Sequence, residues 1–65
     1  MSMKLIRIKE VMNRTGLARS TVYKYINEDK FPKPIKLGAR AVAWVESEIE
    51  DWINEIIQQR NSEAI

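Results

Sequence analysis

Four polar side chains stand close together in the first half of the chain: Arg19, Ser20, Thr21 and Lys24. Arginine and lysine donate hydrogen bonds to guanine O6 and N7, and short hydroxyls contact base edges or phosphates. If the segment is a helix, these residues lie on a different face from its apolar residues. The pattern predicts a helix whose first turns enter a DNA major groove; the alternative is an ordinary solvated helix face. The adjoining Tyr23 suits contact at the groove edge and partial burial equally well.

A glycine gives this segment its structural context. Gly16 accommodates the positive φ that ends a helix sharply, so the sequence predicts one helix over residues 8–15 and a second over about 19–29. Such a pair is a helix-turn-helix. Ala18 stands where a serine or aspartate would cap the second helix, at a cost on the order of 1 kcal/mol. The apolar faces expected to pack together comprise Ile8, Val11, Met12, Leu17, Val22, Tyr25 and Ile26.

Two prolines, Pro32 and Pro34, exclude helix from the next segment, and two short apolar runs follow at residues 35–37 and 41–44. These runs predict a β-hairpin, with Gly38 supplying the unusual backbone dihedral of its turn. The hairpin would be the wing of a winged helix-turn-helix. The residues expected in the core here are Phe31, Ile35, Leu37 and Trp44.

The hairpin also carries cations. Arg40 at the turn and Lys36 before it are expected to contact phosphates or the minor groove, with Lys33 in support. The alternative is that these charges protect a strand edge from pairing. Lys9 and Arg14, on the first predicted helix, are expected to be solvated.

A regular apolar pattern near the end of the chain predicts a third helix. Ser47 and Glu50 have the spacing of a capping box, and acidic residues crowd the first two turns, where the helix dipole favours them. Fraying is expected from Asn61 onward, and residues 3–7 form a short extended lead-in. The apolar stripe consists of Ile49, Trp52, Ile53, Ile56 and Ile57. Burial in the core and pairing with a second copy explain the last two isoleucines equally well.

These elements together predict a mainly α fold, a small winged helix-turn-helix ordered helix–helix–β-hairpin–helix. It is a single domain over residues 1–65, with an ordered core over about residues 4–60.

The composition excludes several kinds of chemistry. The chain has 65 residues and no cysteine or histidine, so disulfides, thiolate metal sites and the commonest general base are absent. Glu48, Asp51 and Glu55 share helical spacing, but an exposed helix face neither shifts a carboxyl pKa nor gathers a full ligand set. We therefore expect no enzyme activity, no catalytic residues, no metal, no cofactor and no small-molecule substrate.

Charge is unevenly distributed along the chain. Residues 1–44 carry ten basic and three acidic residues, a net charge of +7, whereas residues 45–65 carry one basic and six acidic residues, a net charge of −5. This suits a polyanion on one face, although segregated solvated charges are an equal alternative. The sequence contains no apolar run of membrane-spanning length and no signal-peptide pattern, so we expect a cytoplasmic protein with no membrane partner, starting at Met1 or Met3.

Four blocks of sequence, from Leu5 to about Ile57, resemble the AlpA family of small prophage regulators, relatives of phage excisionases and of the winged-helix domain of MerR-type regulators. The blocks are Ile8-Lys9-Glu10-Val11, Thr15-Gly16-Leu17-x-Arg19-Ser20-Thr21-Val22-Tyr23, Phe31-Pro32-Lys33-Pro34-Ile35-Lys36-Leu37-Gly38 and Arg40-Ala41-Val42-Ala43-Trp44-x-Glu46-Ser47-Glu48-Ile49. Ala18 and Ala43 depart from the family pattern, which usually has serine and often glycine there.

The resemblance implies sequence-specific binding to double-stranded DNA and transcriptional control of mobile-element genes, such as an integrase gene. An excisionase that directs recombination is the nearest alternative. A protein-interaction adaptor that binds no DNA is the alternative from another class. A module this small reads a short site, so useful specificity requires a second copy, another DNA-bound protein as partner, or both.

Overall fold

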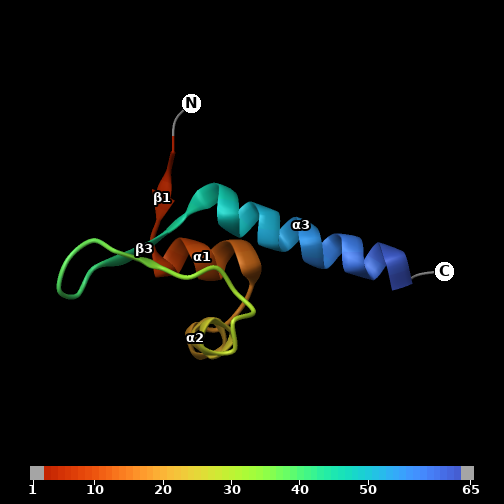
Figure 1. The fold of residues 1–65 in the computed structure, drawn as a ribbon, viewed down its shortest axis with the longest axis horizontal. Helices are drawn as coiled ribbons and strands as arrows, with labels where there is room; N and C mark the ends of the chain where they lie inside the picture. The colour runs from red at the N-terminus through yellow and green to blue at the C-terminus, as the bar shows by residue number, and fades with distance from the viewer. Residues whose placement is uncertain (1–2, 64–65) are drawn as a thin grey trace.

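The structure is a computed structural model that describes residues 3–63. Its elements in chain order are β1 (Leu5–Ile6), α1 (Ile8–Thr15), α2 (Arg19–Asn27), β2 (Ile35–Lys36), β3 (Val42–Val45) and α3 (Glu46–Glu63). Figure 1 shows α1 and α2 beneath a small sheet, with α3 running away from the sheet toward the C-terminus. The winged helix-turn-helix predicted from the sequence is confirmed, with one additional strand.

The glycine turn between α1 and α2 forms as predicted. Gly16 has a φ of 74°, and its N–H donates to the carbonyl of Met12 at 2.8 Å, which closes α1. Thr15 shapes the same turn from the side: its hydroxyl donates to the Val11 carbonyl at 2.8 Å and accepts from the Leu17 N–H at 3.3 Å. The direction in which α2 leaves α1 is therefore held by both backbone and side-chain bonds.

Helix α2 ends at Asn27, two residues before the predicted end. Asp29 has a φ of 59°, in the left-handed region. Its N–H donates to the Ile26 carbonyl at 3.1 Å, and the next N–H, of Lys30, donates to the Tyr25 carbonyl at 2.8 Å. These two bonds form a Schellman cap, a motif that usually has glycine at the left-handed position. Because aspartate also tolerates that region, the helix stops without glycine or proline.

The extended lead-in is a true strand, so the sheet has three strands in the order β1–β3–β2, all antiparallel. The predicted role of Gly38 is wrong, since Gly16 is the glycine with positive φ among the described residues. The Leu37 N–H donates to the Ala41 carbonyl at 2.7 Å across the hairpin. The reversal is spread over the residues between them, so no single position needs a left-handed conformation. Strand β3 then passes directly into α3 at Glu46.

The core lies between α1, α2, the inner face of the sheet and the first half of α3. It consists of Ile6, Val11, Val22, Phe31, Trp44 and Ile49. Leu17, Tyr25 and Ile26 pack against it, as expected. The predicted burial of Ile35 and Leu37 is wrong: Ile35 lies on the edge strand β2 and Leu37 in the loop after it, and both are exposed. Ile56 and Ile57 are also exposed, since α3 continues past the body of the domain.

Candidate nucleic-acid interface

Helix α2 presents its polar residues outward. Arg19, Ser20 and Lys24 are exposed, and Thr21 is half-buried, whereas Val22 on the opposite side is fully buried. Within residues 3–63, the side chains of Arg19, Ser20 and Lys24 make no hydrogen bond or ion pair with the rest of the chain. The hydroxyl and cationic face therefore lies in solvent, in the outward orientation predicted from helical spacing.

Tyr23 faces the core rather than the outer side of α2. Its ring meets the indole of Trp44 edge-on, with centroids 6.3 Å apart and an interplanar angle of 66°. Trp44 is fully buried, and its Nε1 donates to the Pro32 carbonyl at 3.1 Å. Of the two roles compatible with the sequence, the structure favours packing for Tyr23. The contact also links α2 to β3, the strand that leads out of the wing.

The wing places two cations at the edge of the molecule. Lys36, on β2, and Arg40, in the turn that follows, are both exposed. Figure 1 shows the loop between β2 and β3 projecting from the body at the end opposite the C-terminus. Helix α2 and the wing thus supply separate cationic elements, joined through the contact between Tyr23 and Trp44.

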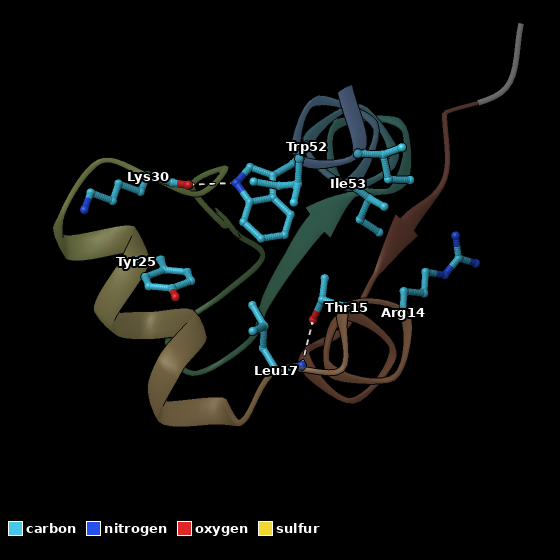
Figure 2. Close-up of a pocket in the computed structure, with 9 residues that line it drawn as sticks. Arg14, Thr15, Leu17, Tyr25, Lys30, Trp52 and Ile53 are labelled. Carbon is cyan, nitrogen blue, oxygen red and sulfur yellow. Dashed lines mark hydrogen bonds between the residues drawn. The ribbon is translucent and has the colours of Figure 1, made fainter. Parts of the chain in front are cut away.

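Helix α3 contacts the turn that follows α2 and helps to fix the position of α2. A hollow of about 500 Å³ lies between the two helices. Leu17 and Tyr25 are on one side of it, and Trp52 and Ile53 are on the other (Figure 2). The Trp52 Nε1 donates to the Lys30 carbonyl at 2.7 Å. The same indole meets the Phe31 ring edge-on, with centroids 4.8 Å apart. The turn after α2 is therefore attached to α3.

Arg14 is the residue whose surroundings differ most from the sequence expectation. Instead of being solvated, its guanidinium pairs with Glu10 at 2.9 Å, Glu46 at 2.8 Å and Glu50 at 3.5 Å. The hydrogen bond to Glu10 is the largest influence and raises the pKa of Arg14; burial lowers it, and the hydrogen bond to Glu46 and the charges of both carboxylates raise it further, so the pKa is raised on balance. Only the pair with Glu10 has a sequence signal, the i,i+4 spacing; the other two partners come from a distant helix. Lys9 is exposed, as expected.

The acidic side chains of α3 that the structure describes are spread over the surface of the helix. Glu48, Asp51 and Glu55 are exposed, and the described part of the chain contains no group of three or more His, Cys, Asp or Glu residues that would hold an ion. None of the helices described is long and apolar enough to cross a membrane.

Two short helices joined by a left-handed glycine, a small sheet with a cationic loop and a third helix define the chain as a winged helix-turn-helix protein. The sequence matches the family described as "Prophage CP4-57 regulatory protein (AlpA)" over residues 4–57, and the chain belongs to this family. The match covers the helix-turn-helix, the wing and the packed half of α3, so the resemblance noted in the sequence is confirmed.

Two relatives illustrate the range of the family. The chain is 33% identical over 60 residues to the protein named "DNA-binding transcriptional activator AlpA" of Escherichia coli (strain K12), covering 83% of this chain and 86% of the relative. It is 42% identical over 50 residues to "Uncharacterized protein ORF88" of Enterobacteria phage P4, covering 77% of this chain and 57% of the relative. The chain thus spans little more than half the length of the phage relative.

Proposed function

We propose that this chain is a sequence-specific DNA-binding protein that regulates transcription of a prophage or another integrated mobile element, with an integrase gene as a target. The observation that carries the proposal is the outward face of α2, where Arg19, Ser20 and Lys24 are exposed and make no hydrogen bond or ion pair within the described residues. Membership of the AlpA family and the similarity to a transcriptional activator support it.

The mechanism follows from the separation of the two cationic elements. The positive charge of residues 1–44 attracts the DNA backbone without regard to sequence, and phosphate contacts set the register of the protein on the duplex. Helix α2 then reads base edges in the major groove through Arg19, Ser20 and Lys24. Lys36 and Arg40 of the wing bind the neighbouring backbone or minor groove. Thr21 supports a phosphate contact at the helix start, while Tyr23 holds α2 against the sheet. The protein acts by binding DNA in the cytoplasm and catalyses no reaction.

Footprinting tests the proposal directly. The DNA is a set of fragments that together span the mobile element carrying the gene for this chain. We expect protection of discrete sites beside a promoter, at a salt concentration where unrelated DNA of the same length is released. Several clustered, bent sites beside an attachment site would instead assign the chain to recombination as an excisionase. No DNA affinity even at low salt would overturn the proposal and favour a protein-interaction adaptor.

A further inference from the structure

Helix α3 keeps an apolar stripe along its second half, beyond the body of the domain. In the first half, Ile49 is fully buried and Ile53 packs against the core. About one turn further on, Ile56 and Ile57 continue the same face of the helix but are 46% and 40% exposed. Figure 1 shows this part of α3 extending past α1 and α2. Of the two roles that the sequence leaves open for these isoleucines, the structure excludes burial in their own core.

The two isoleucines overhang the hollow of about 500 Å³ between α3 and the helix-turn-helix. Ile56 and Ile57 line it from α3, beyond Trp52. Leu17 and Tyr25 line the side opposite (Figure 2). The hollow thus has apolar and aromatic side chains on two sides. An α-helix with its side chains is about 10 Å across, so a further helix laid along the stripe would direct side chains into the hollow.

The charges along α3 favour a second copy of α3, in the antiparallel direction, as that further helix. Helical spacing then sets Ile56 of each copy against Ile57 of the other, and Ile53 against Arg60. The only basic residue of α3 comes to lie near the acidic half of the other helix. Parallel pairing would instead set each charge against itself, with Glu55 beside Glu55 and Arg60 beside Arg60.

A group of carboxylates at the rim of the hollow is suited to a cation from another copy. Three of them share the guanidinium of Arg14, those of Glu10, Glu46 and Glu50. Even with Lys4 at 3.9 Å from Glu46, the group keeps a net negative charge. Glu50 has the longest contact with Arg14, at 3.5 Å, and its side chain is 56% exposed. In the antiparallel arrangement Arg60 of the other copy lies within about one turn of Glu50.

We propose that α3 of one copy packs antiparallel against α3 of a second copy, about a two-fold axis that passes between Ile56 and Ile57. The isoleucines of each copy cover those of the other and close its hollow. The contact is isologous, since both copies use the same surface, so it produces a dimer and leaves no surface open for a third copy.

The overlap is short, so the dimer of the free protein is weak. The paired segments, residues 53–60, are about 12 Å long at 1.5 Å per residue. Stable interfaces bury about 800 Å² from each partner, which is a large share of the 5203 Å² accessible surface of this chain. An exposed ion pair adds little to affinity, so the isoleucines supply the affinity and the charges set the direction. We therefore expect association at high protein concentration, without DNA.

The first test measures the mass of the free protein by sedimentation, at increasing concentrations up to the solubility limit. Replacing Ile56→Gln together with Ile57→Gln removes the apolar contact, and both side chains are at least 40% exposed, so the fold tolerates the change. If circular dichroism shows lost structure, Ile56→Gln alone takes its place. Gln58→Ala, on the opposite side of α3 by helical spacing, is the matched control.

The second test measures the direction of pairing by disulfide formation. The chain has no cysteine, so a single introduced thiol can bond only to its own counterpart in another copy. Ile57→Cys lies next to the two-fold axis and is expected to cross-link. Arg60→Cys is expected to cross-link far more slowly, because the two thiols lie about 10 Å apart along the helix axes.

Wild-type protein and the Gln58→Ala control are expected to approach twice the monomer mass and no more. The isoleucine variant is expected to raise the dissociation constant by more than about tenfold, because polar side chains replace apolar ones in both copies. A wild-type protein that stays monomeric, or an isoleucine variant that associates like wild type, overturns the proposal. Equal cross-linking of Arg60→Cys and Ile57→Cys overturns the antiparallel direction. None of these results bears on DNA binding, which the footprinting experiment tests separately.

Discussion

Arg14 of α1 and Glu46, the first residue of α3, form an ion pair with 2.8 Å between Nη2 and Oε2. The guanidinium also bonds Glu10 within α1 and reaches Glu50 one turn further along α3. A single side chain thus connects the helix before the glycine turn to the helix after the sheet. Because α2 contacts α1 and the turn after it bonds to α3, Arg14 helps to hold in place the helix that we propose to read DNA.

Replacing Arg14 with methionine is expected to lower the Tm, because three carboxylates lose their shared cation while the aliphatic packing is kept. Arg14→Lys is expected to recover only part of the loss, since an ammonium group cannot bridge several carboxylates as a planar guanidinium does. Thermal unfolding at low and high salt measures the effect, which should shrink as salt screens the network. Because the pKa of Arg14 is raised in the folded protein, the stability that this cation contributes is fully present below the ordinary arginine pKa and falls as strongly alkaline pH passes the raised value. A Tm unchanged by Arg14→Met at low salt would contradict the prediction.

Replacing Ala18 with serine is expected to stabilise the protein. Ala18 is the N-cap of α2, with φ −71° and ψ 155°, and no side chain caps the helix there. A serine hydroxyl in this conformation accepts from an N–H of the first turn and raises the free energy of unfolding by about 1 kcal/mol. Urea denaturation measures the gain, and Ala18→Val, which offers no acceptor, is the control. Equal stability of the serine and valine variants would show that the backbone N–H groups of the first turn of α2 gain nothing from a side-chain acceptor.

The two glycines are expected to respond in opposite directions to alanine. Neither position has an atom within 4 Å of an added Cβ, so the difference rests on the backbone alone. Gly16→Ala forces a left-handed alanine and costs about 1–2 kcal/mol of unfolding free energy. Gly38→Ala has no such strain and leaves stability unchanged or raises it by up to about 1 kcal/mol. Paired denaturation curves distinguish the two; a similar loss at both sites would refute the assignment of the turn.

Removing a DNA-facing cation is expected to weaken binding and reduce its salt dependence. Lys24→Ala and Arg40→Ala each remove one phosphate or base contact, so the slope of log K against log salt falls by roughly one for a phosphate contact. Arg60→Ala removes the same charge from the far end of α3 and should bind like wild type. Titration of a labelled duplex at several salt concentrations measures all three. Identical slopes for all variants would place the interface elsewhere.

Local signals predicted much of the helical framework. The bounds of α1 were correct because Gly16 ends it and the apolar period is regular. The end of α2 was missed because Asp29 adopts the left-handed conformation that the sequence analysis reserves for glycine. Strand β1 is only two residues long and exists through its pairing with Val45 and Trp44, which no local pattern reveals.

For the candidate site too, the sequence predicted which face of a helix a residue occupies but not its contacts with distant residues. The outward placement of Ser20 and Lys24 follows from helical period and is observed, while their DNA contacts remain a prediction. The partners of Arg14 on α3 were not predictable, because they depend on how two distant helices cross. The exposure of Ile35 and Leu37 was missed for a different reason: a residue on a short edge strand, or in the loop after it, has few neighbours to cover it, and the sequence does not show which strand lies at the edge.

Strand β3 ends at Val45 and α3 begins at Glu46, with no loop between them. The orientation of α3 is therefore coupled directly to that of the strand that leaves the wing. A helix of 18 residues is about 27 Å long, so a tilt of ten degrees at β3 displaces its far end by roughly 5 Å. A small rotation of the hairpin when it binds a duplex would thus produce a larger displacement of the C-terminal end of α3. A pair of spectroscopic distance probes, one near Arg40 and one near Arg60, would read out that motion.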